Sequence, residues 1–168
     1  MIPSLKENLE STFKGVAVTV PGDNRMSILT PRESIPAVLK YLKESGLDHL
    51  ALISCVDWIE EGKFEIVYLL SSYMRNNTDY SAEQKVQVFL KAQVPRDDPV
   101  LQSVIDVFEN AEPYEREIHE LYGVHFAGHP RLTHLLLERD YEVPPFRKDF
   151  DTRKYVEETF DSIPPIEE

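Results

Sequence analysis

The side chains best suited to chemistry gather in one stretch of this sequence, EREIHELYGVHFAGH, at positions 115–129. Three glutamates, one arginine and three histidines lie within it. Carboxylates and imidazoles perform general acid–base catalysis and bind metal ions, and they also form polar surfaces that recognise other proteins. The stretch therefore allows two interpretations, a reactive site or a surface that locks onto another chain.

A metal site requires ligands at suitable spacing. The candidate ligands are four histidines and two glutamates: His119, His125, His129, His134, Glu115 and Glu120. By helical spacing, Glu115 and His119 share a face, whereas the glycines and proline that follow make the later register irregular. The sequence has no HExxH motif and a single cysteine, Cys55, so it lacks the common zinc and iron–sulfur patterns. A free-standing enzyme with a Glu/His metal site is the alternative interpretation.

Residues 113–123 predict an amphipathic helix that ends at Gly123. Its apolar face consists of Tyr114, Ile118, Leu121 and Tyr122. On another face, Glu112, Arg116 and Glu120 recur every fourth residue, an acid–base–acid series that we call the charged ladder. A solvated ladder contributes roughly 0.2–0.5 kcal/mol per pair, whereas a covered one offers a preformed polar surface.

The segments before this helix predict an α+β body. Two amphipathic helices are expected at residues 4–15 and 34–45, and a hairpin with the turn sequence PGDN at 16–29. Apolar or alternating patterns predict three further strands, at residues 49–58, 64–70 and 85–92.

Two of the predicted elements have more specific patterns. The strand HLALISCVDW is apolar almost throughout and is expected to be covered on both faces. Residues 97–111 predict another helix, with Asp98 as its cap and Pro99 in its first turn. The second of these segments lies just before the charged stretch.

The remainder of the chain has no sustained period. Five prolines occur in the last 39 residues, yet apolar side chains persist, as in LTHLLL at 132–137. A segment of this kind cannot build its own core and is expected to pack along another surface. We predict an α+β body at 1–125, with a small mixed or antiparallel sheet and packed helices of ferredoxin-like type, followed by a long irregular C-terminal arm at 126–168.

Charge and hydropathy limit the partners of this 168-residue chain. Its net charge of −12 argues against a nucleic-acid or anionic-lipid surface, because both require a high density of Lys and Arg. The acidity is uneven, since residues 130–154 hold six basic and five acidic side chains. No apolar run approaches the ~20 residues of a membrane span, and the first residues lack a secretory pattern.

The charged stretch and the arm together resemble the signature of the C-type subunit of respiratory complex I, the NADH–quinone oxidoreductase. The resemblance covers roughly residues 47–150 in order and spacing. The matching positions are Glu115, Arg116, Glu117, Glu120, Tyr122, Gly123, Phe126, Gly128, His129, Pro130, Leu135 to Leu137, Arg147, Lys148, Asp149 and Phe150.

Three positions depart from that signature. Glu120 stands where the family has aspartate, Tyr114 stands where it has tryptophan, and VPPF at 143–146 replaces its Gly-His-Pro-Leu. The last departure resembles the related subunits of membrane-bound, energy-converting hydrogenases. The parent complex is therefore either NADH–quinone oxidoreductase-like or hydrogenase-like.

The resemblance implies a non-catalytic subunit at the cytoplasmic face of the cell membrane, which reaches the membrane only through the assembled complex. No cofactor is expected on this chain, whereas iron–sulfur clusters and a quinone or nickel–iron site are expected on its partners. Those partners are a large subunit, over which the arm is draped, and a small iron–sulfur subunit. The alternatives are the metal enzyme and a generic acidic adaptor domain.

The same resemblance implies that the matching residues bind the partner. The set runs from Glu115 to Phe150 and includes every matching position except the leucines. Charge reversal at Glu115 or Arg147 is then expected to weaken assembly and leave the isolated domain folded.

Overall fold

The computed structural model describes residues 2–72 and 86–159. A five-stranded sheet has the order β1-β2-β5-β4-β3. Its strands are β1 (Ala17–Gly22), β2 (Arg25–Leu29), β3 (His49–Trp58), β4 (Lys63–Ser71) and β5 (Gln87–Pro95). Neighbouring strands are antiparallel except β2 and β5, which are parallel. The predicted α+β class is confirmed, and the sheet, predicted as mixed or antiparallel, is mostly antiparallel.

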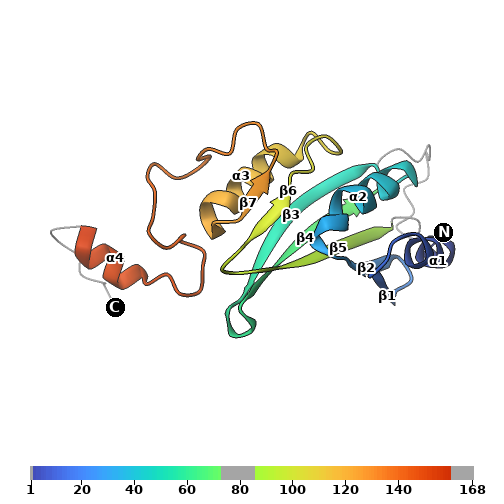
Figure 1. Cartoon of the computed structure of the whole chain (residues 1–168), viewed down its shortest axis with the longest axis horizontal. Coiled ribbons are helices and arrows are strands. Elements are labelled where there is room, and N and C mark those ends of the chain that lie inside the picture. Colours follow the sequence, from blue (N-terminus) through green and yellow to red (C-terminus); the bar gives the residue numbers. More distant parts are fainter. Residues whose placement is uncertain (1, 73–85, 160–168) are drawn as a thin grey trace.

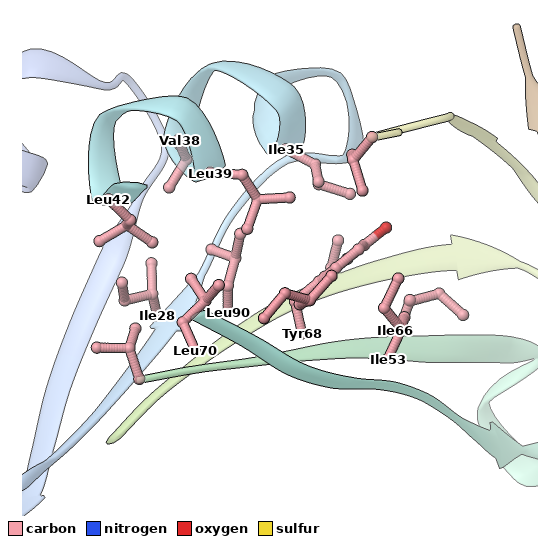
Figure 2. Close-up of a cluster of buried hydrophobic side chains, with 14 of the residues drawn as sticks. Ile28, Ile35, Val38, Leu39, Leu42, Ile53, Ile66, Tyr68, Leu70 and Leu90 are labelled. Carbon is pink, nitrogen blue, oxygen red and sulfur yellow. The ribbon is translucent and has the colours of Figure 1, made fainter. Parts of the chain in front are cut away.

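The helices of the body pack on one face of this sheet (Figure 1). They are α1 (Ile2–Thr12), α2 (Ile35–Glu44) and α3 (Ala111–Tyr122), with short 3-10 turns at Arg32–Ser34 and Ile59–Glu61. Apolar side chains of α2 pack over Tyr68, Leu70 and Leu90 of the sheet (Figure 2). Tyr122 of α3 contacts Phe64, on the same face of β4, with ring centroids 6.0 Å apart. The core therefore lies between this face and the helices.

Two further strands bring the ends of the α3 region together. β6 (Val100–Gln102) and β7 (His125–Ala127) form a parallel pair. The prediction of a helix at 97–111 is therefore wrong. The β-branched Val100 pairs with His125 instead, and the Val104 N–H donates a hydrogen bond to Glu115 of α3. These tertiary contacts override the local helical pattern.

The expectation that β3 is covered on both faces is also wrong within the described residues. Burial alternates along β3, and the side chains of Leu52, Val56 and Trp58 are 37–41% exposed. An antiparallel sheet with helices on one face leaves the other face open, which explains the alternation.

The other predicted elements of the body are present. α1 begins at Ile2, two residues before the predicted start at residue 4. The hairpin of β1 and β2 and the three following strands are confirmed, and Gly46 follows α2 with a φ of +93°. β7 lies across the predicted boundary at residue 125.

The arm is mostly irregular up to residue 151 and then forms α4 (Thr152–Thr159), which no sequence pattern predicted. α4 lies away from the sheet at the end of the described chain (Figure 1). None of its side chains is buried, and its two ion pairs, Arg153–Glu157 and Lys154–Glu158, each join residues four apart. The rest of the predicted arm, residues 160–168, lies outside the described residues.

Candidate functional site

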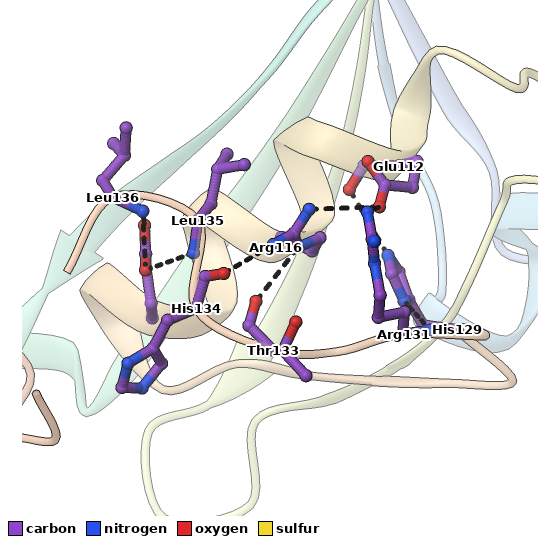
Figure 3. Close-up of polar contacts among 9 residues, drawn as sticks. Glu112, Arg116, His129, Arg131, Thr133, His134, Leu135 and Leu136 are labelled. Atoms are coloured by element: carbon purple, nitrogen blue, oxygen red, sulfur yellow. Dashed lines mark hydrogen bonds and ion pairs between the residues drawn. The ribbon is translucent and has the colours of Figure 1, made fainter. Parts of the chain in front are cut away.

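The charged ladder of α3 binds the chain's own arm (Figure 3). At its first position, Glu112 forms ion pairs with Arg116 and Arg131, and one guanidinium nitrogen of each lies 3.3 Å from Oε1 of Glu112. Arg131 belongs to the arm and directly follows the Gly-His-Pro sequence at residues 128–130, which we call the corner. The ladder that sequence spacing predicted is therefore covered, and the covering segment comes from the same molecule.

The second position of the ladder binds backbone carbonyls. Arg116 donates from Nε to the carbonyl oxygen of Thr133 at 3.0 Å and from Nη2 to that of His134. The residue is 8% exposed, so its guanidinium replaces water by these carbonyls and by Glu112. A buried charge is tolerated when its hydrogen-bonding groups are satisfied in this way.

The third position binds backbone N–H groups. The carboxylate of Glu120 accepts hydrogen bonds from Leu135 at 2.8 Å, Leu136 at 2.9 Å and Leu137 at 3.2 Å. Glu120 is also 8% exposed. The ladder thus binds the arm in chain order, from residue 131 to residue 137. We call residues 135–137 the leucine turn.

The leucine turn directs apolar side chains outward. Leu135 is 38% exposed and Leu136 is 64% exposed, although their backbone N–H groups are bound to a buried carboxylate. In Figure 3 the side chain of Leu136 extends away from the ribbon of α3. The arrangement therefore fixes the main chain and leaves the apolar side chains uncovered.

Glu115 lies on a different face of α3 and is completely buried. Its carboxylate accepts hydrogen bonds from the Ser103 hydroxyl at 2.7 Å and the Val104 N–H at 2.8 Å. Burial raises its pKa from 4.5 to about 6, and these hydrogen bonds act in the opposite direction. Charge reversal at Glu115 is consequently expected to destabilise the fold, which differs from the expectation drawn from the sequence.

The Arg-Lys-Asp-Phe segment packs against the C-terminus of α3. Arg147 donates from Nε to the Tyr122 carbonyl at 2.6 Å, and its guanidinium lies 5.2 Å from the Phe64 ring centroid. Gly123 has a φ of +75°, and a Cβ there would lie 2.8 Å from Nη2 of Arg147. This glycine ends the helix, and its lack of a side chain leaves room for Arg147 of the arm. Burial and the nearby Arg96 lower the pKa of Arg147.

An aspartate of β3 anchors the same segment. Asp57, whose side chain is 2% exposed, pairs with Arg96 through two contacts of 2.9 and 3.0 Å and accepts the Lys148 N–H at 2.9 Å. Arg96 also binds Asp149 at 2.8 Å, and this hydrogen bond holds the pKa of Asp149 below its usual value. Sequence reasoning did not identify Asp57 and Arg96 as a pair. The available signal was an acid inside an apolar strand, which requires a cationic partner.

Two histidines of the stretch, His119 and His129, bind nearby backbone groups. Gly128 has a φ of +84° at the Gly-His-Pro sequence of residues 128–130. His129 accepts the Arg131 N–H at Nδ1 (3.0 Å) and contacts the Glu112 carbonyl from Nε2 (3.3 Å), which requires the neutral ring protonated at Nε2. His119 contacts the Val124 carbonyl at 2.8 Å. Among residues 2–72 and 86–159, no three His, Cys, Asp or Glu side chains are grouped so as to hold a metal ion.

The predicted site residues therefore fall into three groups. Buried residues are Glu115, Arg116, Glu120 and Phe126. Half-buried residues are Glu117, Tyr122, Gly123, His129, Arg147 and Phe150. Exposed residues are Gly128, Pro130, Lys148 and Asp149. The structure brings together α3, the corner and the 147–150 segment, all along the path of the arm.

In the part of the chain that the structure describes, no helix combines the length and apolar character required to cross a membrane.

Comparisons with known proteins converge on one family. The family model described as respiratory-chain NADH dehydrogenase, 30 Kd subunit, matches residues 28–156. The C-type subunit of the F(420)H(2) dehydrogenase from Methanosarcina mazei is 38% identical over 129 residues, which are 76% of each chain. The C-type subunit of a NADH-quinone oxidoreductase from Rhizobium rhizogenes is 32% identical over 140 residues, covering 81% of this chain and 65% of that one.

Solved structures give the same result. A chain from the membrane-bound sulfane sulfur reductase, an archaeal respiratory membrane complex, has a TM-score of 0.82 at 28% identity, over 99% of this chain and 95% of that one. The trypsin-resistant fragment (1–134) of Nqo5 has a TM-score of 0.63 at 27% identity, over 78% of this chain and 98% of that one. The chain belongs to the family of the 30-kDa subunit of respiratory-chain NADH dehydrogenase.

Proposed function

We propose that this chain is a non-catalytic peripheral subunit that docks against the large subunit of a membrane-associated redox complex and supports its assembly. The observation that carries the proposal is the arm, which α3 fixes through backbone hydrogen bonds while Leu135, Leu136 and Phe146 stay exposed. Apolar side chains held in place on the outside of a protein are typical of interaction surfaces. The likeness to a chain of an archaeal respiratory membrane complex extends over 99% of this sequence, arm included.

The cofactors in this proposal belong to other subunits. The large subunit houses the quinone or nickel–iron-like site, and iron–sulfur clusters lie in partners that include the small iron–sulfur subunit. Electron transfer and the ion translocation coupled to it take place there. This chain carries no cofactor, which is supported by the structural hydrogen bonds of His119 and His129. It lies on the cytoplasmic face of the membrane, bound through the complex.

The residues that contact the partner are, in this proposal, those of the predicted site with solvent-exposed surface. They are the exposed residues Gly128, Pro130, Lys148 and Asp149, together with the half-buried Glu117 and Phe150. The buried members act from inside, because Arg116 and Glu120 set the path of the arm and Glu115 fixes the segment before α3. Residues 144–150 are fixed to the C-terminus of α3, because Arg147 donates to the Tyr122 carbonyl and packs against Gly123.

The test is isolation of the complex from native membranes through a tag on the full-length chain. Mass spectrometry is expected to identify a large subunit of the quinone-site or hydrogenase-like type and a small iron–sulfur subunit, at stoichiometric amounts. The sequence of the recovered large subunit decides between the two parent complexes. Membranes from an untagged strain provide the control.

Two results would overturn the proposal. One is recovery of the chain without a large subunit from membranes in which that subunit is detected. The other is a stoichiometric metal ion in the purified chain together with catalytic activity in isolation.

A further inference from the structure

We propose that the leucine turn is the hydrophobic anchor with which this subunit inserts into an apolar pocket of the large subunit. The inference rests on the proposed function. It assigns the main contact to the leucines, which match the family signature but were not among the predicted partner-binding residues. Leu136 is 64% exposed and Leu135 is 38% exposed. A surface leucine in isolation is ordinary, so the informative feature is how these two are held.

The backbone of the turn is fixed before any partner binds. Glu120 accepts the N–H groups of all three leucines, and Arg116 donates to the carbonyls of Thr133 and His134 just before them. Both charged side chains come from α3, a twelve-residue helix packed on the sheet. A contact that is ordered in advance loses less conformational entropy on binding, which favours affinity.

Stability alone does not account for this arrangement. The N–H groups of an exposed turn can be satisfied by water, whereas Arg116 and Glu120 are desolvated, with 8% exposure each. The two buried charges constrain the direction of the turn, and the side chains aimed outward by that constraint are leucines. An orienting device on exposed apolar groups indicates that they meet a complementary surface.

The surroundings of the turn define the chemistry of its partner. The next three residues, Glu138, Arg139 and Asp140, are charged and have solvent-accessible surface, and they make a polar rim beside an apolar centre. Protein interfaces have this composition, with desolvated apolar anchors surrounded by polar groups. The matching surface is an apolar pocket wide enough for a leucine, with polar groups at its edge.

Charge favours a different protein over a second copy or a lipid surface. Each chain carries a net charge of −12, which opposes self-association and repels anionic headgroups. Residues 130–154, which contain the turn, are nearly neutral, with six basic and five acidic side chains. The turn therefore lies in a stretch with a net charge of +1, whereas the remainder of the chain carries −13.

The test uses Leu136→Ser in the full-length tagged chain, with Val20→Ser as the matched control. Val20 lies on β1 and is 44% exposed, so both changes remove an exposed apolar side chain. We expect Leu136→Ser to lower the amount of large subunit recovered per tagged chain at least tenfold, as for an interface anchor. Val20→Ser is expected to leave it within twofold of wild type, and both variants keep the thermal midpoint of the isolated chain.

A second variant tests the positioning role of Glu120. Glu120→Gln keeps all three leucines but replaces the carboxylate that accepts their N–H groups by a neutral amide, which weakens these hydrogen bonds. It is expected to raise amide hydrogen exchange at residues 135–137 and to lower recovery by less than Leu136→Ser does. Slow exchange at these amides in Glu120→Gln would contradict that role.

The outcomes separate this inference from the proposed function. Recovery of the large subunit by wild type and Leu136→Ser alike would overturn the anchor and leave the docking function intact. Failure of wild type to recover it would overturn the function itself. A dimer of this chain that Leu136→Ser abolishes would assign the turn to self-association and also overturn the inference.

Discussion

Three charged side chains of α3 bind backbone groups of segments that lie outside the helix. Glu115 and Glu120 accept N–H groups, and Arg116 donates to carbonyls. Each is 8% exposed or less. Removal of one partner leaves the other buried and unsatisfied, which costs about 1–3 kcal/mol for each group and more if it is charged. These residues therefore determine the local path of the chain more than they determine its surface charge.

Glu115 gives a pH dependence that can be measured. Its pKa is raised from 4.5 to about 6 by burial, so the folded state binds this proton more tightly than the unfolded chain. Its contribution is therefore fully present below pH 4.5 and is lost as the pH rises through about 6. The free energy of unfolding of wild type, minus that of Glu115→Gln, should fall by about 2 kcal/mol across this window.

Urea unfolding of both proteins between pH 4 and 7 measures that difference, and the variant cancels the titration of other carboxylates. A difference that is constant or grows with pH would contradict the assignment.

Gly123 has two separate requirements for glycine. Its φ is +75°, and a Cβ would lie 2.8 Å from Nη2 of Arg147 and 3.1 Å from Cγ of Pro144. Gly46 has a φ of +93° but nothing within 4 Å of its Cβ position, so it is a matched control for the backbone effect alone. We expect Gly46→Ala to cost about 1–2 kcal/mol and Gly123→Ala distinctly more, measured by urea unfolding. Equal losses would show that the arm does not press on this position.

At the scale of elements, α3 holds three segments in place. Its ladder binds residues 131–137, Glu115 binds 103–104, and its C-terminal carbonyls receive Phe146 and Arg147. The two residues after Arg147 are bound from the sheet side. Asp57 of β3 accepts the Lys148 N–H, and Arg96, just after β5, binds Asp149. The first part of the arm is therefore joined to both layers of the body.

The two acids that bind Arg96 should differ in their effect on stability. Asp57 is 2% exposed and Asp149 is 44% exposed at the side chain. Asp57→Asn breaks a buried pair and is expected to cost about 3 kcal/mol. Asp149→Asn removes a pair that solvent screens, so about 0.2–1 kcal/mol is expected. Chemical denaturation measures both, and a larger loss for Asp149→Asn would reverse our assignment of the anchor.

At the scale of the whole molecule, the arm has two parts with different relations to the body. Residues 128–150 are bound by α3, β3 and Arg96, whereas α4 has no buried side chain. The open sheet face, with Leu52, Val56 and Trp58, lies apart from the arm, on the side without helices. Apolar side chains are thus exposed both on the open sheet face and on the arm.

Truncation should distinguish the two parts of the arm. A chain that ends after residue 150 loses α4 and is expected to unfold within about 1 kcal/mol of the full chain. A chain that ends after residue 127 loses the ladder's hydrogen bonds and the contacts of Arg147 and Asp149, so several kcal/mol should be lost at about 1 kcal/mol per bond. Thermal and urea unfolding measure both, and similar stability of the two truncated chains would show that residues 128–150 are not part of the folded body.

Local signals in the amino-acid sequence were sufficient to predict several features. The period of α3, its stop at Gly123 and the spacing of the charged ladder all follow from residues within a few positions of one another. The order of motifs along residues 47–150 was also sufficient to identify the family, since the family model matches 28–156.

What these elements bind depends on contacts between distant parts of the chain. The folded structure has β6 and turns in place of the predicted helix at 97–111, it lays the arm on the ladder, and it joins Asp57 to Lys148 across 91 positions of sequence. Such contacts leave no periodic trace, because a side chain that binds a distant backbone group constrains no pattern near itself. Glu115 and Glu120 are buried only in the folded chain, where water cannot satisfy their carboxylates, so they bind backbone N–H groups of other segments. Arg116 and Glu120 thereby fix the backbone around residues 133–137, and this leaves Leu135 and Leu136 exposed.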